Sequence, residues 1–295
     1  MYLNKKQGGF TLLELLVVIT LLAILSVGAL MAYDGLTESA QAAAKSNNTA
    51  ALDRSIRAYA TIAQKYPNNY DHLVTNTGAS LTFAAEITNT HLASVNISDP
   101  AFRAVFDKMF EEKGIDTIKV RQIAAMTPDL VPNLQHTNGA GTDVSATAIS
   151  AINAFAIVPD SNGAGLPCSI AGTAVANKLN AEVVSIEDAN HLNALNNALE
   201  IQSCDFIVAF GFGHDAAHST FKSRAEIATA PTHTTADVNP AKNYARYVAL
   251  FRVGADKNAD DNIDATELFD KPRLLNVVCA EGHPIDEELA EALEK

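Results

Sequence analysis

The sequence predicts an α+β protein in which one long N-terminal helix packs on a C-terminal antiparallel sheet, with an enlarged, mostly helical insertion between them. Three observations support this fold. An apolar run begins at Phe10, a pattern with helical spacing continues it to residue 66, and three stretches of strand length and composition lie near the C-terminus. We therefore expect a leader peptide at 1–9, a long helix at 10–66 and a globular head at 67–295.

The apolar run from Phe10 to Tyr33 contains a single charged residue, Glu14. A helix of this length, rising about 1.5 Å per residue, reaches roughly 35 Å. The hydrocarbon core of a bilayer is about 30 Å thick. Residues 10–33 are therefore expected to cross a membrane.

The junction before this run differs from that of an ordinary secretory signal, in which small residues follow the apolar region. Here Gly8 and Gly9 precede it. Cleavage after Gly9 would remove the leader and keep the apolar segment as the N-terminus of the mature chain. Because Lys5 and Lys6 hold the leader on the cytoplasmic side, we expect the head on the other side of the membrane.

Glu14 lies inside the apolar segment, where a carboxylate costs about 2.5 to 3.5 kcal/mol on insertion scales. Cleavage after Gly9 creates a positive α-amino group on Phe10. The amine of a neighbouring subunit, shifted by about one helical turn, can lie against Glu14 and pair with its charge at low dielectric. This arrangement predicts that the chains assemble with one another through this segment.

Residues 5–19 resemble the class III signal of type IV pilins and type II secretion pseudopilins: they read Lys-Lys-Gln-Gly-Gly-Phe-Thr-Leu-Leu-Glu-Leu-Leu-Val-Val-Ile. The resemblance implies that prepilin peptidase cuts between Gly9 and Phe10, that the amine of Phe10 is methylated and that Glu14 guides subunit addition. It also implies the pilin-like lollipop, a helical stalk that bears a head.

The same resemblance implies where the protein acts. The precursor would be a single-pass protein of the bacterial inner membrane with an extracytoplasmic head. An assembly motor and platform would then add it, with other pilin-like subunits, to a periplasmic or cell-surface filament. One feature departs from the family, because many members carry a proline near the end of the apolar segment, whereas all ten prolines here lie at position 67 or later. Gly28 and Gly35 each lower helix propensity by about 1 kcal/mol relative to alanine, so melting near Gly28 stays open.

Beyond the membrane the helix is expected to continue as an amphipathic half that ends before Pro67. This half would lay an apolar stripe on the sheet, while an alanine-rich opposite side, which includes residues 42–44 and Ala50, faces other helices. The stripe consists of Leu52, Ile56, Tyr59, Ala63 and Tyr66.

In the head, Asp99 and Pro100 are typical of a helix start and Gly114 of a helix end, which predicts a helix over these residues. We expect a strand at 115–125 and further helices at 146–155 and 187–200. These helices would form the insertion between about residues 80 and 200. Residues 205–212, 244–253 and 274–279 are rich in Val, Phe and Tyr and are predicted to form the antiparallel sheet.

Charge and cysteine content limit the function. The net charge of −13 disfavours binding to nucleic acid, because an acidic surface repels phosphate. Cys168, Cys204 and Cys279 are too scattered for a disulfide framework or a spaced zinc motif. One bridge is possible in an exported head, and the pairing among the three stays open.

Residues 256–267 resemble an EF-hand-type calcium loop, in which hard oxygen ligands wrap a cation and the last glutamate binds through both oxygens. The candidate Ca²⁺ ligands are Asp256, Asn258, Asp260, Asn262 through its backbone carbonyl, Asp264 and Glu267. Asp261 stands where the motif has glycine, although Asp tolerates positive φ better than most residues. The alternative is a solvated acidic turn between two strands. Calcium would order this loop and would not catalyse a reaction.

His214 and His218 have the spacing of a zinc-protease helix, with Asp215 where that motif has Glu. The match is poor, because no third ligand is evident and a polar loop at a strand end explains the pattern. No phosphate loop, nucleophile elbow or catalytic carboxylate pair stands out, so we expect no enzyme and no cofactor other than calcium.

Two functions from different classes fit the sequence, and a third depends only on His214 and His218. The first is a structural subunit of a filament, either a pseudopilin of a type II secretion system or a type IV pilin. The second is an adhesin or binding module displayed on the filament, with residues 80–200 contacting its ligand. The third is a membrane-tethered enzyme.

Overall fold

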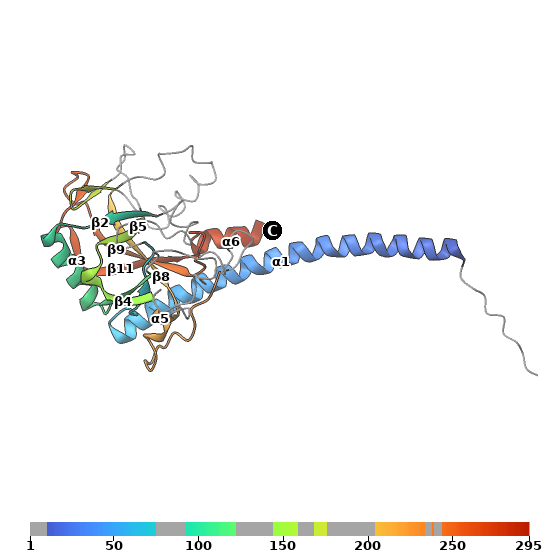
Figure 1. The fold of residues 1–295 in the computed structure, drawn as a ribbon, viewed down its shortest axis with the longest axis horizontal. Coiled ribbons are helices and arrows are strands. Elements are labelled where there is room, and N and C mark those ends of the chain that lie inside the picture. Colours follow the sequence, from blue (N-terminus) through green and yellow to red (C-terminus); the bar gives the residue numbers. More distant parts are fainter. Residues whose placement is uncertain are drawn as a thin grey trace, which may run out of the picture.

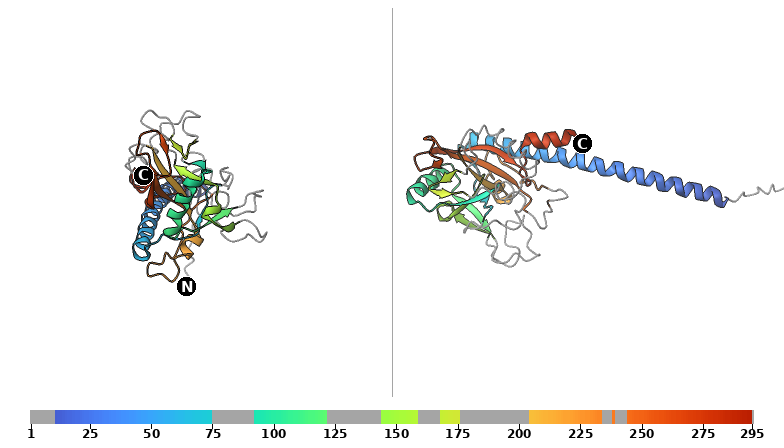
Figure 2. Two further views of the ribbon diagram at one scale, coloured as in Figure 1. Left: turned by 90° about the vertical axis from the view of Figure 1, so that its left-hand side faces the viewer. Right: turned by 90° about the horizontal axis from the view of Figure 1, so that it is seen from above.

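The longest element is helix α1 (Leu12–Ala63), whose N-terminal half projects from the head in this computed structural model of the chain (Figure 1). Two further views show the same projection (Figure 2). The structure describes residues 11–74, 92–121, 144–158, 168–175, 204–233, 238 and 244–294. The predicted leader, Phe10 and the predicted helix at 187–200 lie outside these residues.

Helix α1 is continuous and agrees closely with the predicted helix at 10–66. Thr11 is its N-cap, and it ends at Gln64, which adopts the left-handed conformation with φ of 56°. Gly28 lies inside it and is helical in the single chain. No proline interrupts this stretch, so no residue within it lacks the backbone N–H that a continuous helix uses.

The C-terminal half of α1 packs on the head as the stripe predicts. Leu52 and Ile56 are buried, and Tyr59 is partly buried against the same core. The prediction that Ala42 lies on the outward side is wrong, because Ala42 is only 3% exposed. Helical periodicity continues the buried stripe back from Ile56 to Ala42.

The C-terminal helix α6 (Ile285–Glu294) lies beside this part of α1 (Figures 1 and 2). Ser46 and Thr49 are buried in α1 on the same stripe as Ala42. Helix α6 was not among the predicted elements, although Pro284 and the acidic first turn that follows it are typical of a helix start.

The main sheet has the strand order β11–β9–β8–β1–β3–β4, in which β4 is Val144–Ala148. Strand β5 (Ala154–Val158) also pairs with β8, and β2 (Ala93–Asn96) pairs with β5. Its long strands confirm the three C-terminal strands of the prediction. They are β8 (Asp205–Phe212), β9 (Tyr247–Ala255) and β11 (Leu268–Val278), which pair in antiparallel fashion. The short strand β1 (Tyr70–Asp71) pairs with the end of β8 and runs parallel to β3 (Thr117–Arg121).

The predicted helix between Asp99 and Gly114 is confirmed as α3 (Pro100–Glu112). The Asp99 carboxylate accepts the backbone N–H of Phe102 at 2.7 Å, as an N-cap does. Strand β3 confirms the described part of the strand expected at 115–125. Helix α3 lies at the end of the head farthest from the projecting part of α1 (Figure 1).

The predicted helix at 146–155 is wrong. The chain there forms β4 (Val144–Ala148), a short 3₁₀ turn and β5 (Ala154–Val158). The alanines favour a helix locally, but β5 pairs with both β2 (Ala93–Asn96) and β8 and is buried throughout. This pairing outweighs the modest local preference. In the described part of residues 80–200, α3 is the only α-helix, so the described insertion is not mostly helical.

The core lies on both faces of the sheet. On one face Phe206, Val208 and Phe210 of β8 meet side chains of α1 and α3. On the other face Ile207 and Ala209 meet a smaller cluster. Strand β8 is therefore buried on both sides, which explains why its sequence is apolar at nearly every position.

Polar groups at the edge of this core are tightly placed. Tyr244 donates its hydroxyl hydrogen to Asp71 at 2.7 Å. A Cβ atom at Gly211 would lie 1.9 Å from the Tyr244 oxygen, so only glycine fits there.

Burial lowers the pKa of His72 to about 4, and its Nε2 atom lies 2.8 Å from the carbonyl of Ala154.

Candidate functional site

The N-terminal half of α1 carries an extended apolar surface that the head does not cover. Residues Leu12–Met31 form a helix long and apolar enough to cross a membrane, and none of this span is buried in the head. Leu12 is 83% exposed and Leu25 is 68% exposed. Apolar surface of this kind is stable only in a bilayer or against other apolar surfaces, since each Å² kept in water costs about 25 cal/mol.

Glu14 lies in the first turn of α1, where it forms a capping box with Thr11. The backbone N–H and the hydroxyl of Thr11 donate to one Glu14 oxygen at 2.8 and 2.9 Å, and the Glu14 N–H donates to the Thr11 hydroxyl at 3.3 Å. These neutral donors offset part of the cost of the carboxylate within one chain, but they leave its charge uncompensated. Gly9 and Phe10, the predicted processing residues, lie outside the described residues.

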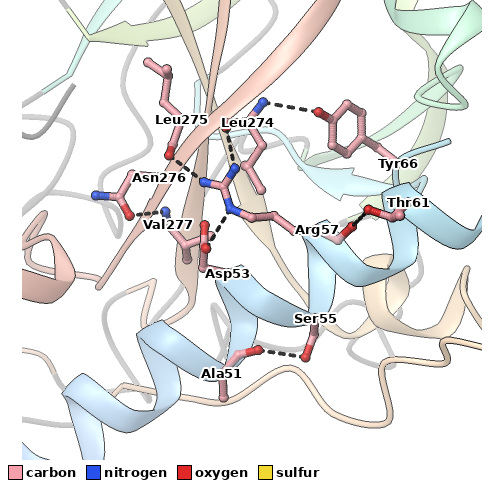
Figure 3. Close-up of polar contacts among 10 residues, drawn as sticks. All are labelled: Ala51, Asp53, Ser55, Arg57, Thr61, Tyr66, Leu274, Leu275, Asn276 and Val277. Atoms are coloured by element: carbon pink, nitrogen blue, oxygen red, sulfur yellow. Dashed lines mark hydrogen bonds and ion pairs between the residues drawn. The ribbon is translucent and has the colours of Figure 1, made fainter. Parts of the chain in front are cut away.

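Arg57 fastens α1 to the sheet (Figure 3). Its guanidinium donates to the carbonyls of Leu274 and Leu275 at 3.0 and 2.6 Å and to the Asp53 carboxylate at 2.8 Å. The pairing of β11 with β9 shifts register between Leu274 and Asn276. A bulge of this kind disrupts the ladder of hydrogen bonds, and Arg57 supplies donors at this point.

We predict that Arg57→Ala lowers the free energy of unfolding by about 1 to 3 kcal/mol, because two strand carbonyls and Asp53 lose a charged donor. Arg54→Ala is the matched control, since Arg54 is exposed one turn earlier on the same helix. Denaturant unfolding of the full chain in detergent measures both variants. Equal stability of the two variants would contradict this role of Arg57.

The acidic loop (residues 256–267) connects β9 to β11 and is held by its own backbone. Glu267 accepts the N–H groups of Lys257 and Asp264 at 2.7 and 3.0 Å, one on each carboxylate oxygen. Asp256 accepts the N–H of Asp261 at 2.9 Å. Hydrogen bonds from Thr266 lower the pKa of Asp264 and keep it ionised.

Asp261 has a φ of 62°, so the position where a calcium loop carries glycine adopts the left-handed conformation here as well. The small sheet of β6 (Ser169–Ile170), β7 (Thr173–Ala174) and β10 (Asn262–Ile263) anchors this side of the loop. The Cys168–Cys204 disulfide stands at its base, where the Asp256 N–H donates to the Cys204 carbonyl at 2.9 Å.

Carboxylate oxygens of Asp256, Asp260 and Glu267 lie within 4.8 Å of one another, so the structure brings three of the predicted ligands together. Asn258 and Asp264 lie in the same loop, and their side chains accept backbone N–H groups. The Asn262 side chain instead accepts the N–H of Gly172, which ties the loop to the turn between β6 and β7. Negative charges this close together repel one another, and a hard divalent cation would relieve this repulsion.

The two histidines of the zinc-protease spacing lie on α5 (His214–His218), a helix of little more than one turn. Their rings stack with centroids 6.0 Å apart. The groups of potential metal ligands among the described residues include neither of them. Asp215 between them is buried and pairs with Lys119 at 3.0 Å.

A basic pocket of about 310 Å³ opens where the end of α1 meets β11. None of the described side chains that line it is acidic, although the chain has 34 Asp and Glu residues against 21 Lys and Arg. Its cations are Arg57, Lys65, Lys113, Lys271 and Arg273. A pocket lined in this way can hold an anionic group.

Sequence reasoning missed the residues that depend on contacts between distant segments. Arg57 and the Cys168–Cys204 pair are examples, because neither a lone arginine on a helix nor a scattered cysteine signals its partner. The position of Cys279 as the free and buried thiol also follows only from the fold.

Comparison with known proteins identifies one segment. Residues 4–30 match the family described as the prokaryotic N-terminal methylation motif. No curated protein and no solved structure matches the chain.

Proposed function

We propose that this chain, which carries at residues 4–30 the class III signal of type IV pilins and pseudopilins, is a structural subunit of an extracytoplasmic type IV pilus-like filament. The motif implies a pilin-like or pseudopilin precursor that prepilin peptidase processes and that assembles with other pilin subunits. The filament would be a type IV pilus or the pseudopilus of a type II secretion system.

One observation carries the proposal: directly after the motif's cleavage junction, the chain places an exposed apolar helix with a single carboxylate in its first turn. A bilayer covers this surface in the precursor, and neighbouring α1 helices cover it in a filament. The acidic head would face outward, and Arg57 would couple it to the helical core. The inner-membrane motor and platform would draw the subunits from the bilayer.

We predict that the mature chain begins at methylated Phe10, and that Gly9→Leu retains the leader, because the motif requires a small residue at the cleaved bond. Mass spectrometry of the N-terminus, on protein from membranes and from filaments, measures both. Gly8→Ala is the control and should be trimmed as the wild type is. An intact Met1 in isolated filaments would contradict the proposal.

We also propose that the acidic loop binds Ca²⁺ through Asp256, Asn258, Asp260, Asn262, Asp264 and Glu267. The convergence of three carboxylates and the left-handed Asp261 support this assignment. Bound calcium would order the loop against the small sheet and would stabilise the head. Its role would be structural, so the ion takes part in no reaction.

We predict that Ca²⁺ at about 100 times its Kd stabilises the full chain by about 2.7 kcal/mol, and that EGTA reverses the effect. Asp260→Asn should remove most of this gain, since an amide keeps hydrogen-bonding capacity and loses the charge. Asp270→Asn is the matched control, because Asp270 is exposed in β11 outside the loop. Thermal melts with and without Ca²⁺ test the proposal, and a wild-type melting temperature that does not respond to Ca²⁺ would refute it.

A second candidate function is a filament-displayed binding module. The basic pocket favours it, because five cationic side chains gather there on an acidic chain. The part proposed to contact the ligand is residues 80–200, which contribute Lys113 to the lining of this pocket. Copy number in purified filaments separates the two functions, since a binding tip is rare and a structural subunit is dominant. We propose no catalytic role for the head.

A further inference from the structure

Four side chains of the types that bind transition metals meet where β11 ends and α6 begins. One ligand atom from each of Cys279, Glu281, His283 and Glu288 lies within 4.8 Å of the others. Cys279 and Glu288 are fully buried. The side chains of Glu281 and His283 are 16% and 12% exposed, so the cluster lies just below the surface.

A tight turn brings these residues together. The N–H of Gly282 donates to the Cys279 carbonyl at 3.1 Å, and the N–H of Cys279 donates to the His283 carbonyl at 3.1 Å. Gly282 has a φ of 96°, a conformation that side chains rarely permit. The N–H of Glu281 donates to the Cys279 sulfur at 3.3 Å. Burial and the neighbouring Glu288 raise the pKa of the Cys279 thiol, so a metal that binds its sulfur would displace the thiol proton.

The fourth member comes from a separate element. Glu288 lies in the first turn of α6, and its Oε1 atom is 3.9 Å from Nδ1 of His283. Because α6 packs along α1, the cluster joins the end of the sheet to both helices. Lys45 of α1 and His233 also contact Glu281, at 2.9 and 3.0 Å.

We propose that Cys279, Glu281, His283 and Glu288 form a binding site for Zn²⁺ or a divalent metal of similar softness. A thiolate, an imidazole nitrogen and carboxylate oxygens form a donor set that zinc accepts, with bond lengths of about 2.0 to 2.3 Å. Calcium and magnesium prefer oxygen alone, so the sulfur and nitrogen separate this site from the acidic loop. The site holds a closed set of four protein ligands, which is typical of a structural zinc.

The charges agree with this assignment. With zinc bound and the thiol proton released, a thiolate and two carboxylates would bring three negative charges into one buried place, and Zn²⁺ together with Lys45 would supply three positive charges. Buried charges that are compensated in this way are tolerated, whereas buried like charges alone repel. The metal would tie α6 to β11 and so hold α6 beside α1.

Zinc and cobalt binding to the full chain in detergent test the proposal. Metal analysis of the wild type after dialysis should give one zinc per chain. Titration with Co²⁺ should give the intense band of a cobalt–thiolate bond together with the weaker bands of tetrahedral cobalt. Because Cys168 and Cys204 form the disulfide, a cobalt–thiolate band can come only from Cys279.

Cys279→Ser should abolish the cobalt–thiolate band. It should also weaken zinc binding by about 100-fold or more, because losing a residue that only hydrogen-bonds to a metal ligand already weakens metal binding by about 10- to 100-fold. His283→Ala and Glu288→Gln should weaken zinc binding similarly while far-UV circular dichroism shows an intact fold. The matched control is His218→Ala, since His218 is an exposed histidine outside the cluster, and it should bind zinc as the wild type does. A wild-type chain that binds no zinc, or that binds Co²⁺ without the thiolate band, overturns the site.

Discussion

Glu14→Ala is expected to be trimmed after Gly9 and inserted in the membrane, yet to be lost from filaments. The substitution removes a carboxylate that costs about 2.5 to 3.5 kcal/mol in the bilayer, so insertion becomes easier. If Glu14 pairs with the Phe10 amine of the next subunit as proposed, assembly loses the charge that attracts this amine. In the wild type, the Thr11 donors do not remove the need for a positive partner. They are neutral groups of the same chain, so they hydrogen-bond to the carboxylate and leave its charge uncompensated.

Glu14→Gln separates the two roles of this residue. A glutamine keeps the shape and can still accept the hydrogen bonds from Thr11, but it carries no charge. We therefore expect it to fail in assembly as alanine does, with normal processing. Quantifying the variant in sheared filaments and in membranes, beside the wild type, gives the measurement. Normal filaments with glutamine would show that capping of the helix, and not charge pairing, is what assembly requires.

The long N-terminal helix could be predicted because its signals are local. The length of the apolar run, the junction at Gly9 and the helical spacing of Leu52 and Ile56 are each visible within a few turns. The structure confirms the helix and the buried stripe. The burial of Ala42 is not visible in the local pattern, and the part of the chain that packs along α1 includes α6, from the other end of the sequence.

The middle of the head could not be predicted in the same way. Residues 146–155 are rich in alanine and favour a helix over short range, but β5 is fixed by partners far away in sequence, β2 and β8. Strand pairing of this kind is decided by the whole sheet and not by one segment. The C-terminal strands were easier, since β8 and β9 are buried on both faces and are therefore apolar at nearly every position.

The candidate sites show the same contrast between local signals, which the sequence displays, and contacts between distant segments, which it does not. The acidic loop is contiguous, so its spacing could be predicted, and the structure adds the positive φ of Asp261 and the convergence of the carboxylates. The Arg57 contact, the Cys168–Cys204 disulfide and the cluster around Cys279 each join separate elements. Their residues carry no local signal, because the partner of each is chosen by the fold.

Phe106→Ala is expected to lower the free energy of unfolding of the head by about 3 to 5 kcal/mol. Phe106 is fully buried at the centre of an aromatic cluster between α3 and the sheet. Its ring centroid lies 5.0 Å from that of Phe110, 4.9 Å from that of Phe155 and 5.7 Å from that of Phe206. Removing the ring leaves a cavity and breaks these contacts together with a fourth, to Phe102 at 6.3 Å. Each such contact adds about 0.5 to 1.5 kcal/mol beyond its buried area.

Phe221→Ala makes the same chemical change where the side chain is 54% exposed, so it should cost far less. Denaturant unfolding of both variants, in the full chain with detergent, measures the difference. Because α3 and β5 both belong to residues 80–200, a large loss for Phe106→Ala would show that this segment is part of the main core. A loss no greater than that of Phe221→Ala would instead mean that α3 and β5 fold apart from the long strands β8 and β9, and that the head is not stabilised by one shared aromatic core.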